Sequence, residues 1–277
     1  MSKKYTLLNP VSVGGCQLMI EYWQLKINYK DLKDAPSSGL STSQRLSIRR
    51  GNNFRPTIQV IIAALNEEDG IALTINELME TLNNPNILVV DGNSTDRTVE
   101  VAKELGAQVV FQDGQGKGDA LAKGIKNLQS VDYVVITDAD YTYPAEYIHE
   151  MLQILDENPK VGMVCGNRFT DKTDPKAMHN IFYIGNRLIA FMHNALNGVE
   201  LIDPLTGLRV VRADILKDWK VQSKGFDIEV ELNHYIERKG YGIVEIPILY
   251  RQRVGEKKLK VRHGVAILKR IVQETTF

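Results

Sequence analysis

From Pro56 onward, short runs of β-branched and other apolar residues alternate with longer segments whose apolar positions recur at helical spacing. The short runs predict buried strands at residues 57–65, 86–90, 108–112 and 132–137. The segments between them predict helices at residues 66–82, 119–128 and 144–155, and a helix that is capped by Ser94 or Thr95 and runs to about 105. Continuous apolar strands that alternate with helices are typical of a mostly parallel sheet covered on both faces. The pattern therefore predicts an α/β fold.

Polar clusters stand where four of these strands end or shortly after. They occupy residues 66–68, 91–94, 114–118 and 138–140. Ligands of parallel sheets bind beyond the carboxyl ends of the strands. Four clusters on one rim therefore indicate a binding site more strongly than any one of them does.

Two carboxylates, Asp138 and Asp140, follow the run that ends at Thr137. Residues i and i+2 of an extended segment point to the same side. Such a pair can hold Mg²⁺ or Mn²⁺, which proteins often bind through one or two carboxylates together with substrate phosphates. The alternative is that the pair caps the next helix, where Asp is also favoured.

Two further clusters have the composition of ligand-binding turns. Asp91 ends a strand before Gly92 and can accept a hydrogen bond from a nucleobase ring N–H, although a capped turn without a ligand is the alternative. Lys117 lies among three glycines in residues 114–118, where the backbone can approach a ligand and the ammonium can neutralise phosphate charge. The glycine spacing matches neither the Walker loop nor G-x-G-x-x-G, which argues against a dinucleotide-dependent oxidoreductase.

Other charged residues remain ambiguous from sequence alone. Arg168 suits bidentate phosphate recognition, and a surface ion pair is its alternative. Asp227 and Glu229 begin a predicted helix, where they either face the site or favour the helix N-terminus. The five histidines show no metal-ligand spacing.

Composition narrows the functional classes. The 277 residues carry 34 basic and 34 acidic side chains, so charge gives no general argument for nucleic-acid binding. Two cysteines, Cys16 and Cys165, favour a reduced intracellular protein over a disulfide framework. No signal peptide is recognisable, and the best candidate for a membrane span, residues 181–202, is interrupted by polar residues.

The ends of the chain differ from its middle. Residues 1–55, with a linker-like stretch at 34–43, are predicted to form an N-terminal extension of unassigned role before a domain at 56–277. Residues 251–277 contain eight Lys or Arg against two Glu. This basic end suggests an acidic partner, with a solvated tail as the alternative.

Taken in order, these motifs resemble glycosyltransferase family 2, and the dolichol-phosphate mannosyl- and glucosyltransferase branch in particular. The resemblance covers about residues 57–262. It is carried by residues 61–68, 91–98, 116–118, 138–140, 166–169, 207–209, 226–231, 240–247 and 255–259.

The resemblance implies a GT-A fold, a nucleotide-sugar donor and a divalent metal. The residues that it assigns to the nucleoside are Ala64, Asn66, Glu67 and Asp91. It places Lys117 near the donor and gives the metal to Asp138 and Asp140. Arg168 and residues 253–258 would meet phosphates of donor or acceptor. The family often has Gln where Thr142 stands, so the third metal ligand is undefined, and many relatives carry C-terminal membrane helices.

The expected activity is inverting transfer of a hexose from a UDP- or GDP-sugar to polyprenyl (dolichyl-type) phosphate. An alternative is a hydroxyl acceptor, which needs a general base such as Asp227 or Glu229. A second alternative is a non-catalytic nucleotide-sugar-binding protein. A lipid acceptor implies a cytoplasmic protein at the membrane surface or beside a membrane partner protein. The basic segment 258–272 would suit that surface if helical, with Val261, Val265, Leu268 and Val272 on one side.

Overall fold

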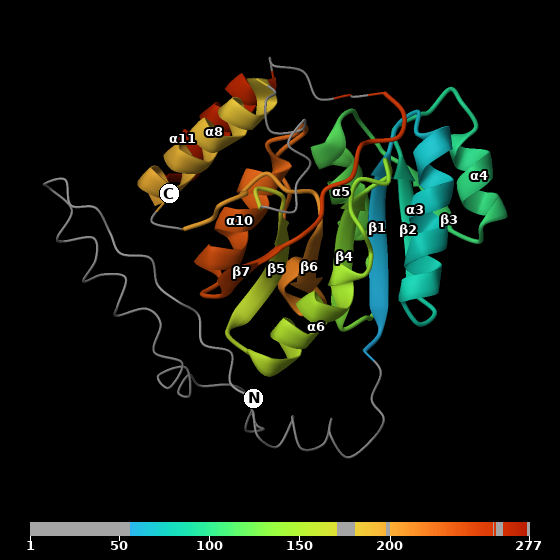
Figure 1. Ribbon diagram of the computed structural model, residues 1–277, viewed down its shortest axis with the longest axis horizontal. Helices are drawn as coiled ribbons and strands as arrows, with labels where there is room; N and C mark the ends of the chain where they lie inside the picture. The colour runs from blue at the N-terminus through green and yellow to red at the C-terminus, as the bar shows by residue number, and fades with distance from the viewer. Residues whose placement is uncertain (1–55, 171–180, 198–199, 257, 259–262, 276–277) are drawn as a thin grey trace, which may run out of the picture. The chain divides into compact units, whose positions relative to one another are not determined.

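The computed structural model describes residues 56–170, 181–197, 200–256, 258 and 263–275 (Figure 1). All of them belong to one compact unit, Asn53–Phe277. The expectations for the extension 1–55, Cys16 and Val261 therefore lie outside the described residues.

Seven strands and eight helices make up the described unit. The strands are β1 (Ile58–Ala64), β2 (Asn86–Asp91), β3 (Gln108–Phe111), β4 (Tyr133–Asp138), β5 (Val161–Asn167), β6 (Arg209–Arg212) and β7 (Gly242–Pro247). The helices are α3 (Glu68–Thr81), α4 (Thr98–Glu104), α5 (Lys117–Lys126), α6 (Tyr147–Glu157), α8 (Ile181–Asn197), α9 (Ala213–Leu216), α10 (Ile228–Arg238) and α11 (His263–Thr275).

The strands form one sheet in the order β3-β2-β1-β4-β6-β5-β7 (Figure 1). Pairings among β1, β2, β3 and β4, and between β5 and β7, are parallel. The short strand β6 runs antiparallel to both of its neighbours, β4 and β5. The predicted mostly parallel α/β fold is confirmed, and β5, β6 and β7 are additions to the four strands that the hydrophobic pattern predicted.

Helices cover both faces of the sheet. Along β1, Val60 and Ile62 point to one face, where they pack with Ile71 and Ile75 of α3 and with apolar residues of α6. Ile61 points to the opposite face, where the partners come from α5, α9 and α10. This alternation within a continuous apolar run explains why the strands lack a polar face.

Two of the predicted helix starts are wrong. Helix α4 begins at Thr98, because the Ser94 hydroxyl bonds Asp91 while Asp96 accepts from the backbone N–H of Thr98. Helix α6 begins at Tyr147, after a turn that includes Pro144. Elsewhere the predicted and observed boundaries differ by one or two residues.

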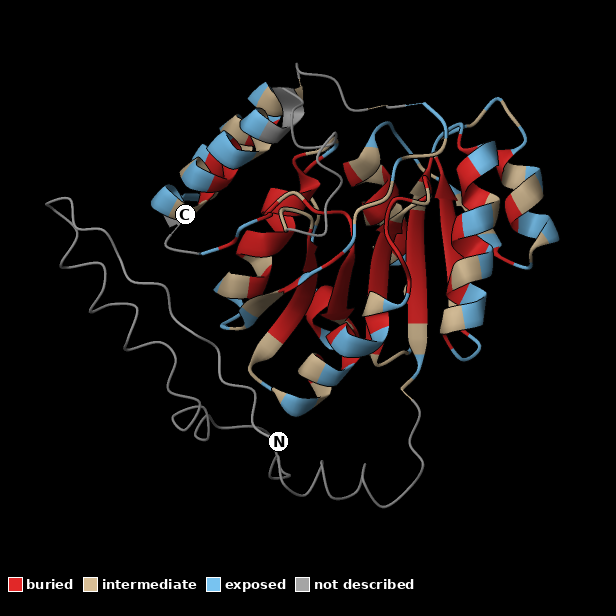
Figure 2. Cartoon of the chain, in the orientation of Figure 1, coloured by how far each residue is buried: buried red, intermediate tan, exposed pale blue. Residues whose placement is uncertain are grey.

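Helices α8 and α11 pack on α10 outside the main layers. Ile189, Val230, Ile267 and Ile271, one or two from each helix, form a small separate core. The stripe expected from sequence is divided: Leu268 packs against this core, whereas Val265 and Val272 are 71% and 52% exposed. Figure 2 shows the outer faces of the two helices as largely exposed. In the described part of the chain, no helix is long and apolar enough to span a membrane.

Candidate active site

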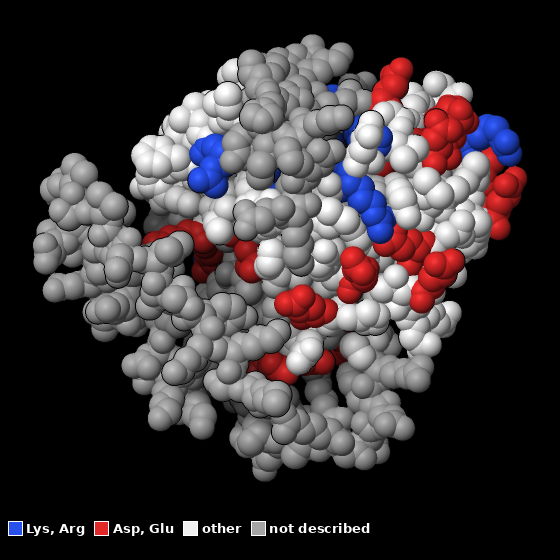
Figure 3. Space-filling view, viewed as in Figure 1, with Lys and Arg blue, Asp and Glu red and all other residues white. Residues whose placement is uncertain are grey.

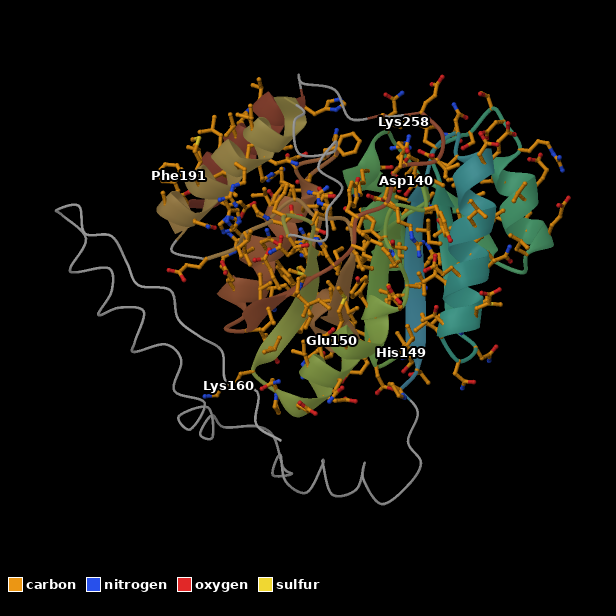
Figure 4. All side chains as sticks on the ribbon, viewed as in Figure 1. Asp140, His149, Glu150, Lys160, Phe191 and Lys258 are labelled. Carbon is orange, nitrogen blue, oxygen red and sulfur yellow. The ribbon has the colours of Figure 1, made fainter. Side chains whose placement is uncertain are left out.

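The polar clusters of β1, β2 and β4 meet at one edge of the sheet, as predicted. Asp138 ends β4 beside Ala63 of β1, and Ala64 pairs with Asp91 at the end of β2. Asp140 lies on this rim near Lys258, which comes from the far end of the sequence (Figure 4). The sheet thus gathers residues from widely separated segments.

Asp138 forms an ion pair with the ammonium group of Lys117. The Lys117 ammonium lies 2.6 Å from Asp138 Oδ1 and 2.7 Å from Glu229 Oε1. Burial alone would lower the pKa of Lys117, but the two carboxylates outweigh burial and raise it. Burial would likewise raise the pKa of Asp138, and Lys117 outweighs that effect, so the pKa is lowered. Asp138 is therefore an ionised carboxylate with a fixed orientation.

Asp140 lies in a tight turn that packs closely against helix α3. Its Oδ1 accepts hydrogen bonds from the Thr142 hydroxyl and backbone N–H, at 2.6 and 3.2 Å. Tyr141, between Asp140 and Thr142 in the sequence, has a φ of +62°. This backbone conformation is strained for a bulky residue, and such strain is common at functional sites. A Cβ on Gly70 of α3 would lie 2.7 Å from the Ala139 carbonyl oxygen, so glycine permits this close approach.

The loop that follows β7, residues 248–256, closes over the two carboxylates. Its backbone N–H groups at Arg251 and Val254 donate to the carbonyls of Thr142 and Asp140, at 3.0 and 3.1 Å. Arg253 Nη1 lies 3.0 Å from Asp140 Oδ2, and its Nη2 bonds Glu67. The guanidinium thus bridges one predicted metal ligand and one predicted nucleoside residue.

Glu67 has unsatisfied bonding capacity. Its side chain is buried, and its Oε2 atom has no hydrogen-bond partner among the described residues, nor does Arg253 Nε. Burial raises the pKa of Glu67 to about 7, although Arg253 and Lys258 act in the opposite direction. Buried polar atoms without partners are rare, and these two atoms are therefore available to bind a ligand of the site.

Three of the predicted nucleoside residues, Ala64, Asn66 and Asp91, already make hydrogen bonds with the 91–98 turn. Asp91 is fully buried, and its two oxygens accept from the backbone N–H and hydroxyl of Ser94, at 2.8 and 2.6 Å. The Asn66 side chain accepts from Thr95 N–H at 2.8 Å, while the Ala64 carbonyl accepts from Gly92 N–H. These bonds give the 91–98 turn a fixed shape. Direct contact of Asp91 with a base remains a prediction.

Arg168 lies near the site with its guanidinium already engaged. It makes a bidentate pair with the buried carboxylate of Asp203, at 2.6 and 2.7 Å. Glu245 in turn accepts the backbone N–H groups of Ile202 and Asp203. Sequence analysis gave no role to Asp203, which lies outside the motifs, or to Glu245, which lies in the 240–247 motif without a distinguishing pattern of its own.

The last two candidate residues, Glu229 and Asp227, have different surroundings in the structure. Glu229 joins the site through Lys117, and its Oε2 atom is buried without a partner among the described residues. Asp227 is not brought to the Asp138–Asp140 pair. Its oxygens accept from Ser223, Gly225 and Arg270 of α11, so it links the start of α10 to the C-terminal helix.

The arrangement is suited to a divalent cation and an anionic ligand. Asp138 and Asp140 are hard oxygen ligands, and within the described residues no group of three or more His, Cys, Asp or Glu could complete a protein-only site. Mg²⁺ commonly keeps waters and binds one or two carboxylates plus substrate phosphates. The donor set therefore fits a metal whose other ligands come from a bound diphosphate.

Residues 59–219 match the family model for glycosyl transferase family 2. The chain belongs to this family. The resemblance found in the sequence motifs is therefore confirmed, and so is the GT-A fold.

Several proteins with named activities are similar in sequence to this chain. A dolichyl-phosphate hexose transferase of Haloferax volcanii is 34% identical over 220 residues, which are 78% of this chain and 92% of that protein. The glycosyltransferase AglJ of the same organism is 34% identical over 194 residues, or 70% of this chain. The chain spans 63% of the length of AglJ and 58% of that of a second relative, the hexosyltransferase Agl6.

Solved structures share the fold. Glucosyl-3-phosphoglycerate synthase of Mycobacterium tuberculosis, in complex with Mn²⁺, UDP-glucose and phosphoglyceric acid, aligns with a TM-score of 0.66. The alignment covers 87% of this chain and 86% of that one, at 20% identity.

Proposed function

We propose that this chain is an inverting glycosyltransferase that moves a hexose from a UDP- or GDP-sugar to a polyprenyl phosphate of the dolichyl type. The observation that carries the proposal is the rim carboxylate pair, Asp138 and Asp140, closed over by Arg253 next to the unsatisfied Glu67. The names of the Haloferax relatives support a dolichyl-phosphate acceptor, and the Mn²⁺ and UDP-glucose of the structural neighbour support the metal and donor.

The metal would be Mg²⁺ or Mn²⁺ on Asp138 and Asp140, and it would neutralise charge that develops on the leaving diphosphate. Lys117 keeps Asp138 ionised and oriented from below. Arg253 is placed to turn from Asp140 to the donor phosphates once the cation has neutralised that carboxylate. Ala64, Asn66, Glu67 and the 91–98 turn would hold the nucleoside.

The reaction itself needs little from the protein beyond positioning. An oxygen of the acceptor phosphate attacks the anomeric carbon, the bond from that carbon to the diphosphate breaks, and the configuration inverts. Because a phosphate monoester has a second pKa of about 6, the acceptor is already an anion near neutral pH and needs no general base. Arg168 is held by Asp203, and its charge helps to lower the pKa of Asp138. In this proposal Arg168 would lie on the acceptor side of the site.

The state of the two candidate bases favours the phosphate acceptor over a hydroxyl. A hydroxyl acceptor requires a carboxylate that is able to take a proton. Glu229 is paired with Lys117, and Asp227 is paired with Arg270. The presence of both metal carboxylates also argues against a purely binding role.

A donor screen with purified protein tests the proposal. Radiolabelled UDP-glucose and GDP-mannose are each incubated with polyprenyl phosphate in detergent and Mn²⁺ or Mg²⁺, with Asp140→Asn as the inactive control. We expect one donor to yield a labelled, acid-labile lipid. Transfer to a hydroxyl acceptor with none to polyprenyl phosphate would overturn the proposal. The acceptor implies a peripheral protein at the cytoplasmic face of a membrane.

A further inference from the structure

Helix α8 turns a row of large apolar side chains toward solvent. Ile184, Leu188 and Phe191 follow one another at i, i+4 and i+7 and are 69%, 56% and 70% exposed. The opposite side of the helix carries buried residues, among them Ile189 and Ala190. The labelled Phe191 lies on the side of α8 away from the sheet (Figure 4). Exposed apolar residues in such a row mark a contact surface rather than chance exposure.

Helix α11 continues this surface. It packs beside α8 and, through Ile267 and Ile271, on the small core that α10 shares. Its outward-facing Val265 is 71% exposed. We call the outward faces of the two helices, with Ile184, Leu188, Phe191 and Val265, the α8–α11 platform.

The exposed charges of the platform have one sign. Arg187 and Lys269 are exposed among the apolar residues, while the sequence of α8 contains no acidic residue. The acidic residue of α11, Glu274, is turned to Arg238 and Arg270 in ion pairs of 2.7 and 3.4 Å. In Figure 3 a basic patch lies among uncharged side chains at the upper left, and acidic side chains lie below it. The platform is thus apolar and cationic.

The chain connects the platform directly to the catalytic rim. The Lys258 ammonium donates to the Asn66 carbonyl at the rim, at 3.1 Å, and α11 begins at His263, soon after it in the sequence. Asp227, just before α10, is bound by Arg270 of α11 at 3.0 Å. Helix α11 is thus close in sequence to a rim residue and is fixed to the start of α10 by an ion pair.

We propose that the α8–α11 platform docks on an anionic lipid surface, with its apolar side chains in the headgroup–acyl boundary and its cations against lipid phosphates. The inference rests on the proposed function in one respect, since it supplies the surface from which a lipid-linked acceptor is reached. Apolar rows flanked by basic residues are the features of helices that lie in a membrane interface. A second copy of the chain fits less well, because it would bring two basic faces together.

Co-sedimentation of the full chain with vesicles that contain no polyprenyl phosphate tests docking separately from catalysis. We expect binding to mixed phosphatidylcholine–phosphatidylglycerol vesicles and much weaker binding to phosphatidylcholine alone. Phe191→Glu should weaken binding at least about tenfold, since the ring no longer enters the boundary. Leu73→Glu is the matched control, because Leu73 is an exposed apolar residue of α3, 44% accessible, and binding should not change.

The electrostatic contribution has its own variants. Arg187→Gln and Lys269→Gln should each weaken binding to the anionic vesicles by about fivefold at low salt and have less effect at high salt. Lys103→Gln, at an exposed position of α4, is the control that should leave binding unchanged.

The outcomes separate the two proposals. Phe191→Glu should retain transfer to polyprenyl phosphate in detergent while losing vesicle binding. Equal vesicle binding by wild type and Phe191→Glu overturns the docking proposal, as does a concentration-dependent dimer that the same substitution dissociates. Vesicle binding without transfer to polyprenyl phosphate from either donor leaves docking intact and overturns the proposed function.

Discussion

Arg253 lies 3.0 Å from Asp140, with its guanidinium where a cation would neutralise one of the two rim carboxylates. The same guanidinium bonds Glu67, so one side chain joins the assigned metal site to the nucleoside side of the rim. A divalent cation and the Arg253 guanidinium would therefore compete for the Asp140 carboxylate. Metal binding would release Arg253 for the phosphates of the donor.

This competition predicts opposite effects of one substitution. Arg253→Gln should raise the affinity of the donor-free protein for Mn²⁺ by about fivefold, because the metal no longer displaces an ion pair. Turnover should fall, because the donor phosphates lose a charged partner. Manganese titration followed by electron paramagnetic resonance measures the first effect. Arg251→Gln is the control, since Arg251 pairs with Glu77 and not with the carboxylates. Weaker Mn²⁺ binding by Arg253→Gln would contradict the competition.

Asp140→Asn should remove metal-dependent transfer while the fold survives. The amide keeps an oxygen for the hydrogen bonds from Thr142 but lacks the charge that holds a cation. We expect turnover to fall by at least about a hundredfold and the Mn²⁺ affinity to fall with it. Circular dichroism and the urea midpoint should stay close to those of wild type. Undiminished activity in the presence of a chelator would exclude the assigned role.

Gly207 is predicted to be essential for the position of Asp138. A Cβ at this residue would lie 2.9 Å from Asp138 Cγ and 3.0 Å from the ring of Tyr143, whose hydroxyl accepts a hydrogen bond from Gly207 N–H. Gly207→Ala should therefore lower both turnover and Mn²⁺ affinity. Gly185→Ala is the control, because a Cβ there meets nothing within 4 Å and should slightly stabilise α8. Equal activity of both variants would refute the argument.

Two buried histidines predict a loss of stability in weak acid. Burial lowers the pKa of His193 to about 4, aided by His234, and burial lowers the pKa of His234 to about 4, aided by Arg238. An unfolded histidine has a pKa of about 6.5, so between these values the unfolded chain binds more protons. Stability should fall as the pH drops from about 6.5 to 4, by up to about 1.4 kcal/mol per pH unit for each histidine.

Urea unfolding at several pH values measures this dependence. His234→Gln should flatten it, whereas His149→Gln, on an exposed part of α6, should not. Burial raises the pKa of Glu245, which acts in the opposite direction, so the difference between variant and wild type is the relevant quantity. An unchanged slope in His234→Gln would show that this histidine does not titrate as expected.

Local pattern was enough to predict the first four strands and the rim at which they end. Asp138 and Asp140 could be found because they follow an apolar run whose end must lie at the ligand-binding edge of a parallel sheet. Glu67 and Asp91 were found in the same way. In each case the information lies within a few residues of the strand.

Contacts between distant segments could not be predicted in this way. Lys117 was expected to lie near the donor and neutralise phosphate charge, and in the structure it is held by Asp138 and Glu229. These two carboxylates are far apart in the sequence, and no periodicity of the sequence indicates that both contact Lys117. Arg168 was expected either to bind phosphate or to form a surface ion pair, and the structure pairs it with the buried Asp203, which the sequence did not indicate. The strand β6 is four residues long, and its antiparallel placement between β4 and β5 is set by pairing rather than by composition.

The bond between Glu67 and Arg253 joins residues that are 186 positions apart in the sequence. A ribosome making this protein therefore releases both rim carboxylates long before the arginine that covers them. A nascent or truncated chain that ends before the loop after β7 contains the rim carboxylates but lacks Arg253, the cation that pairs with Asp140. Such fragments are expected to be inactive, because they lack the Arg253 side chain that contacts Asp140 and Glu67.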